Sequence, residues 1–174
     1  MGTCLSWAAI RGKPASVVLR ALGYTTTGTR EPLFWRDSTQ VPYMAGAYHD
    51  WYFLFGNGND FMSAPTLAQS LSIGSEVVVC FVESHAMVSS AAGFRDGKRI
   101  WSVVHDALHR GAAHLEATGA PPAAWPAIQR TARSKSKPGV DYLFDAPIDL
   151  AAAVTGFRHD RPTDCDFDVI ARAA

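Results

Sequence analysis

Residues 93–101 read GFRDGKRIW, and the Asp-Gly pair at positions 96–97 decides how this part of the chain folds. Asp-Gly is a preferred pair for a two-residue type I′ turn, in which both residues need a positive φ. The flanking stretches would then pair as antiparallel strands, with Ala92 opposite Trp101, so that a small residue faces a large one. The sequence therefore predicts a β-hairpin whose second strand covers residues 99–106.

The second strand of this hairpin leads into HDALH at residues 105–109, which differs from the zinc-protease pattern H-E-x-x-H at one position. In a helix, His105 and His109 would share a face, as two zinc ligands must. In a strand, His105 and Asp106 point to opposite faces. Asp106 is also one methylene shorter than the Glu that the pattern requires. Because the hairpin places His105 in a strand, we predict that HDALH is not a zinc site.

Prolines and glycines indicate where helices begin and end. Three segments place a proline nine residues before a glycine, which suits a short helix because proline favours the first turn and glycine the closing left-handed residue. These segments cover residues 14–23, 65–74 and 147–156, and a fourth helix is predicted over residues 123–133. Apolar runs predict strands at residues 5–10, 51–55, 76–83 and 114–118.

The predicted strands and helices do not alternate regularly. That order favours an α+β fold, with a mostly antiparallel sheet of about five or six strands and three or four short helices packed on it. Residues 25–46 show little periodicity and are predicted to form a long loop. With 174 residues, the chain is expected to form a single compact domain over residues 1–174.

The composition argues against several classes of protein. Hydrophobic residues make up 48% of the chain and charged residues 18%, which is typical of a globular rather than a disordered protein. The formal net charge is zero, whereas nucleic-acid binders usually present a basic surface. The basic run at residues 130–137 is interpreted as a solvated helix end. We therefore expect no nucleic-acid partner.

The cysteines and the apolar runs bear on the location of the protein. The three cysteines, Cys4, Cys80 and Cys165, form no C-x-x-C motif, which favours a reducing, cytoplasmic compartment. No apolar run approaches the roughly 18 residues of a membrane span, so no membrane partner is expected. The opening MGTCLS matches a myristoylation pattern at Gly2, with Cys4 placed for a second acyl chain. A buried first strand is the preferred interpretation of this stretch.

Three polar residues near strand ends carry the enzyme hypothesis. If the strand at residues 76–83 lies near the hairpin, Glu83, His85 and His105 would meet at one end of the sheet. Two histidines and a carboxylate can hold a metal ion or act as acid and base. The competing interpretation is that polar residues emerge into solvent where strands end. On that interpretation, neither a metal nor another cofactor is predicted.

Two other stretches are candidates for a partner surface. The aromatic stretch YHDWYFLF contributes Trp51 and Tyr52, although core packing is the common use of such residues. Closer to the C-terminal end, Asp160, Asp164 and Asp166 form an acidic stretch that would steer a basic protein partner.

The sequence contains no nucleophile elbow, phosphate-binding loop or EF-hand pattern. Together with the aromatic and acidic stretches, this favours a non-catalytic, intracellular binding protein that blocks a protein partner. Usage rich in Ala and Arg is typical of bacterial proteins, so the expected setting is a bacterial inhibitor of the immunity type. The alternative hypothesis is a small hydrolase or metal-dependent enzyme that uses the His/Glu site.

Overall fold

A computed structural model describes residues 3–33, 42–135, 137 and 139–173. Its strands are β1 (Cys4–Arg11), β2 (Tyr24–Pro32), β3 (Tyr43–Tyr48), β4 (Trp51–Asn57), β5 (Glu76–Glu83), β6 (Val88–Arg95), β7 (Lys98–Asp106), β8 (Glu116–Gly119) and β9 (Asp166–Arg172). The helices are α1 (Ala15–Leu22), α2 (Pro65–Leu71), α3 (Ala107–Arg110), α4 (Trp125–Ser134) and α5 (Asp145–Thr155), with a 3₁₀ turn η2 (Phe61–Ser63).

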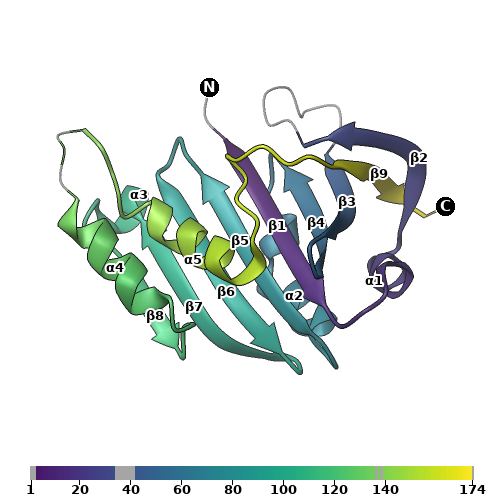
Figure 1. Cartoon of the computed structure of the whole chain (residues 1–174), viewed down its shortest axis with the longest axis horizontal. Coiled ribbons are helices and arrows are strands. Elements are labelled where there is room, and N and C mark those ends of the chain that lie inside the picture. Colours follow the sequence, from purple (N-terminus) through teal and green to yellow (C-terminus); the bar gives the residue numbers. More distant parts are fainter. Residues whose placement is uncertain (1–2, 34–41, 136, 138, 174) are drawn as a thin grey trace.

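The strands form one twisted antiparallel sheet in the order β2-β9-β3-β4-β1-β5-β6-β7-β8 (Figure 1). Helices α4 and α5 cover one face over the β5–β8 half, and α1 and α2 pack on the other face. Because the central strands are covered on both faces, they carry apolar residues on both. The VVVCFV run of β5 is an example, with four consecutive buried residues from Val77 to Cys80.

The α+β class and the antiparallel sheet are confirmed, but the predicted strand count is wrong. The part of the chain that the structure describes forms nine strands, rather than five or six. Strands β2, β3 and β9 were missed, and the predicted loop over residues 25–46 contains β2, apart from Tyr24, and most of β3. Residues 34–41 of that predicted loop lie outside the described residues. The residues of β2 after Tyr24 are mostly exposed, so this edge strand lacks the apolar alternation from which a strand is predicted.

The hairpin is confirmed, with a correction to its register. Beyond the turn the structure has a β-bulge, so that Gly93, rather than Ala92, pairs with Trp101. The bulge leaves Ile100 43% exposed and turns Trp101 into the core at 7%. A Cβ on Gly93 would lie 2.1 Å from the indole nitrogen of Trp101, so glycine is required at this position.

The four predicted helices correspond to α1, α2, α4 and α5, within a few residues at each end. Gly23 and Gly156 close α1 and α5 in the left-handed conformation, as the spacing predicts. Among the described residues, no helix is both long enough and apolar enough to cross a membrane.

Candidate functional site

The strand register separates Glu83 from His105. Glu83 pairs with Val88, which pairs with Asp106, whereas Ser89 pairs with His105 in the adjacent row. Side chains in adjacent rows point to opposite faces of a sheet. Glu83 and His105 therefore lie on opposite faces, and the structure does not bring together the residues on which the enzyme hypothesis depends.

Glu83 instead lies beside the first strand, opposite Cys4. Its Oε1 accepts a hydrogen bond from the backbone N–H of His85 at 3.0 Å. Burial, followed by the hydrogen bond with Glu83 and its charge, raises the pKa of the Cys4 thiol to about 12. A thiol with so high a pKa is a poor nucleophile near neutral pH. Gly2, the residue of the acylation hypothesis, lies outside the described residues.

His105 is fully buried in β7 and joins two distant segments of the chain. Its Nδ1 donates a hydrogen bond to the backbone oxygen of His114 at 2.6 Å, and its Nε2 lies within hydrogen-bond distance of Oδ2 of Asp141, at 2.8 Å. The ring is therefore held through both of its nitrogens, beside a carboxyl group inside the fold.

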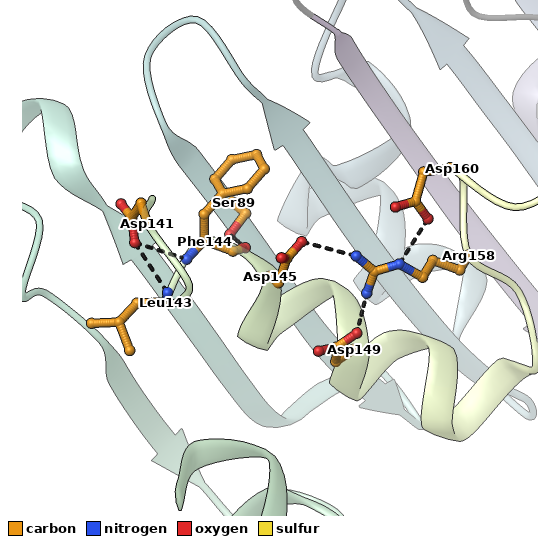
Figure 2. Close-up of polar contacts among 8 residues, drawn as sticks. All are labelled: Ser89, Asp141, Leu143, Phe144, Asp145, Asp149, Arg158 and Asp160. Carbon is orange, nitrogen blue, oxygen red and sulfur yellow. Dashed lines mark hydrogen bonds and ion pairs between the residues drawn. The ribbon is translucent and has the colours of Figure 1, made fainter. Parts of the chain in front are cut away.

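Asp141 extends this connection to the chain that leads into α5. Its Oδ1 accepts hydrogen bonds from the backbone N–H groups of Leu143 and Phe144, at 3.0 Å and 3.3 Å (Figure 2). The hydroxyl of Ser89 in β6 donates to the backbone oxygen of Phe144 at 2.6 Å. We call His105, Asp141, Ser89 and their backbone partners the His105 cluster. It fixes the turn before α5 to both β6 and β7.

The other polar residues of HDALH complete a helix cap. Oδ1 of Asp106 accepts a hydrogen bond from the backbone N–H of His109 at 2.9 Å, and the pKa of Asp106 is lowered chiefly by this bond. The side chain of His109 is 72% exposed, whereas that of His105 is 0% exposed. The two histidines do not share a site, and the predicted strand at His105 is confirmed.

The prediction that Trp51 lies on a partner surface requires a correction. Its side chain belongs to the core, with the residue only 4% exposed, and the guanidinium of Arg11 lies 4.5 Å from its ring centroid. Tyr52 is half-buried, and burial, followed by the charge of Asp168, raises its pKa to about 12. The physical reason is that β4 is an inner strand whose side chains enter the core on both faces of the sheet.

The residues of the predicted acidic stretch lie in different environments. Asp164 and Asp166 are exposed, and Asp166 begins β9, which lies between β2 and β3. Asp160 is half-exposed, and its Oδ1 accepts a hydrogen bond from Nε of Arg158 at 2.7 Å. Of the predicted acidic residues, Asp160 is the one that belongs to a larger ionic cluster.

That cluster forms around Arg158, which binds three carboxylates at once (Figure 2). Besides Asp160, its guanidinium donates to Asp145 at 2.8 Å and to Asp149. Asp145 and Asp149 project from α5, whereas Arg158 and Asp160 belong to the segment that follows it. The Arg158 side chain is 11% exposed, and the three aspartates are 44–50% exposed. We call these four residues the Arg158 cluster.

Three carboxylates share one guanidinium within the Arg158 cluster, and the positive charges of Lys135 and Arg161 also act on Asp149. Burial raises the pKa of Asp149 despite the opposing charge of Arg158, and the negative charge of Asp145 adds to the increase. Burial also acts to raise the pKa of Asp160, but the hydrogen bond and charge of Arg158 outweigh it and lower that pKa overall. The carboxylates of one cluster therefore differ in how strongly they are stabilised as anions.

Sequence reasoning named Asp160 but missed Asp145, Asp149 and Arg158. Asp145 and Asp149 are four residues apart at the start of a predicted helix, where such residues share a face, so this spacing was an available signal. The return of Arg158 to the same face depends on the path of the chain after Gly156. The sequence predicts that the helix ends at Gly156, but not where the following segment lies.

Two adjoining concave surfaces lie beside these clusters. A groove of about 540 Å³ between α4 and α5 is lined by Asp145 and Asp149, among others. A pocket of about 630 Å³ is lined in part by Asp141. Lys135 and Tyr142 line both surfaces, so the groove and the pocket are neighbours.

Comparisons with protein-family models, with curated proteins and with solved structures found no match for this chain. Within the described ranges, no group of three or more His, Cys, Asp or Glu side chains is placed to hold a metal ion. Functional inference therefore depends on the geometry of the two clusters and of the surfaces beside them.

Proposed function

We propose that this chain is a non-catalytic binding protein that recognises a basic surface of a protein partner through the Arg158 cluster. The observation that carries the proposal is the imbalance of charge in that cluster, in which one guanidinium holds three half-exposed carboxylates. A surface with unbalanced negative charge attracts a basic partner and raises the rate of encounter.

The arrangement of the carboxylates also supports binding. Arg158 is largely buried and contacts all three aspartates, so their positions are fixed before a partner arrives. Fixed side chains lose less conformational entropy on association than free ones do. A partner that offers lysine or arginine side chains would meet a prearranged set of acceptors.

The environment of His105 favours binding over catalysis at this position. His105 uses both ring nitrogens in hydrogen bonds inside the fold, which leaves neither of them to act as acid or base on a substrate. Asp106 serves as the cap of α3. His105 and Asp106 therefore both have structural roles within the fold.

An inhibitor of the immunity type, working in a bacterial cytoplasm, is the biological setting that we propose for this binding. Enzymes that act on nucleic acids present basic surfaces to a polyanionic substrate. An acidic inhibitor surface would complement such a target and compete with its substrate.

The test is capture of a partner from lysate of the native source, followed by measurement of the purified complex. We expect a stoichiometric protein partner whose affinity falls with added salt. Asp149→Lys should weaken that affinity about tenfold or more, mainly by slowing association. The matched control is Glu31→Lys, which makes the same charge reversal in β2 at the opposite end of the sheet.

Recovery of no stoichiometric partner would contradict the proposal. Equal weakening by Glu31→Lys and Asp149→Lys would contradict the assignment to the Arg158 cluster, because the loss would then reflect net charge alone.

A further inference from the structure

A pocket of about 630 Å³ lies where the turn before β6, helix α3, the end of α4 and the segment that precedes α5 come together. Its volume falls within the roughly 300–1,000 Å³ that is typical of sites for small molecules. The pocket is separate from the Arg158 cluster, since none of the four residues of that cluster lines it. We call it the basic pocket, for the side chains described below.

Much of the lining of the basic pocket is apolar. Met87, Ala107, Ala132 and Leu143 contribute, and Val140 is 44% exposed beside them. An exposed aliphatic side chain next to an apolar recess gains free energy when a ligand covers it, at about 25 cal/mol per Å² of apolar area removed from water. The lining therefore favours the apolar body of a ligand.

Positive charge surrounds this apolar lining. Arg133 at the end of α4, Lys135 and Lys137 all line the pocket. Among the residues that the structure describes, neither Arg133 nor Lys137 has an ion-pair partner. The acidic lining residue, Asp141, is already paired with His105. Cations without a partner in the fold are therefore available to an anion.

The part of the pocket wall formed by residues 141–144 is held in place. The side chain of Asp141 binds His105 and the backbone of residues 143–144, which fixes the segment next to β6 and β7. The ammonium of Lys135 lies 5.5 Å from the ring centroid of Tyr142, another lining residue. A wall that is ordered before binding reduces the entropy lost when a ligand enters.

We infer that the basic pocket binds a small organic anion with an apolar body, such as an alkyl carboxylate or an alkyl phosphate. The anionic head contacts Arg133 and the neighbouring lysines, and the alkyl chain covers Met87 and Val140. Charge-assisted hydrogen bonds from a guanidinium suit either head group, and apolar contact supplies the rest of the affinity. This binding activity goes beyond the proposed recognition of a protein partner and does not depend on it.

The experiment is calorimetric titration of the purified chain with four probes, each kept below the concentration at which it forms micelles. Decanoate and decyl phosphate combine an anionic head with an alkyl chain, decanol lacks the charge, and inorganic phosphate lacks the chain. We expect saturable one-to-one binding of decanoate, decyl phosphate or both, at least tenfold tighter than that of decanol or inorganic phosphate. The tighter of the two amphiphiles identifies the preferred head group.

Matched variants locate the site. Arg133→Met should weaken binding of the amphiphile about tenfold, whereas Arg130→Met, on the same helix but outside the lining, should leave it unchanged. Ala112→Trp should block the pocket, with Ala113→Trp as the control beside it, since Ala112 lines the pocket and both residues are exposed.

Three results would overturn the inference. The first is no saturable binding of either amphiphile. The second is binding of decanol as tight as that of the amphiphiles, which would show that the cations play no role. The third is an equal loss of affinity in Arg130→Met and Arg133→Met, which would place the binding elsewhere.

Discussion

The two polar clusters that hold α5 differ in both exposure and number of carboxyl groups. In the His105 cluster, one imidazole ring faces one carboxyl group, at 0% and 14% exposure, and backbone groups take up the remaining hydrogen bonds. In the Arg158 cluster, one guanidinium faces three carboxylates that are each about half-exposed. The first cluster is complete within the fold, whereas the second leaves negative charge at the surface.

This difference separates stability from recognition. A buried pair with every hydrogen bond satisfied offers nothing to a partner, but removing one member leaves the other polar group buried without its hydrogen bond. A half-exposed cluster with unbalanced charge contributes less to stability, because solvent screens it, and it remains available to a partner. Substitutions in the two clusters should therefore affect different properties and by different amounts.

The largest effect is expected from Asp141→Ala. The variant removes the acceptor of the buried His105 ring and of two backbone N–H groups, and should lower the free energy of unfolding by about 3 kcal/mol. Asp141→Asn keeps an oxygen acceptor and should lose roughly half as much. Urea denaturation followed by circular dichroism measures both.

The control for this prediction is Asp164→Ala, at an exposed carboxylate, which should change the free energy of unfolding by less than about 0.5 kcal/mol. A loss below about 1 kcal/mol in Asp141→Ala would mean that the His105 cluster is not the stabilising element described here.

The contrast between the clusters also explains what could be predicted from the sequence. The strand at His105 follows from an Asp-Gly turn nine residues earlier, and the four helices follow from proline and glycine spacing. Signals of this kind are local, and the predictions made from them are confirmed. The one-residue bulge beside Gly93 was not predicted, because it depends on how Trp101 packs in the finished fold.

The partners within each cluster depend on contacts between distant residues. Asp141 is 36 residues from His105, and the segment that carries it could not be placed without the positions of α4 and α5. The edge strand β2 was missed for a related reason: it pairs with β9, which lies more than a hundred residues later, and its side chains are largely exposed. Hydrophobic patterns report burial, and they carry little information about exposed edge strands or ionic partners.

A smaller effect is expected from Arg158→Met. The change leaves three neighbouring carboxylates without their shared cation, and should lower the free energy of unfolding by about 2 kcal/mol at low ionic strength. Repulsion among half-exposed carboxylates is screened by salt, so the loss should shrink when salt is raised. The loss in Asp141→Ala should change little with salt, because its groups are buried. Equal salt dependence of the two variants would contradict the comparison.

The smallest effects separate two carboxylates within the Arg158 cluster. A carboxyl whose pKa is lowered by folding, such as Asp160, stabilises the fold above its unfolded pKa and loses that contribution as the pH falls through its folded pKa. A carboxyl whose pKa is raised, such as Asp149, contributes below its unfolded pKa and loses that contribution as the pH rises through its folded pKa.

Near neutral pH, Asp160→Asn should therefore destabilise the protein by about 0.5 kcal/mol, whereas Asp149→Asn should be neutral or slightly stabilising. Both effects are small because solvent screens these half-exposed groups. On acidification the difference for Asp149→Asn should vanish first, because the raised pKa of Asp149 lets it take up a proton at a higher pH, whereas the lowered pKa of Asp160 preserves the difference for Asp160→Asn to lower pH. Urea denaturation of the wild type and the two variants at pH 7 and at stepwise lower pH measures these differences. Destabilisation of the same size in both variants at pH 7 would show that Arg158 holds its carboxylates equally, and the two aspartates would then be equivalent as anions.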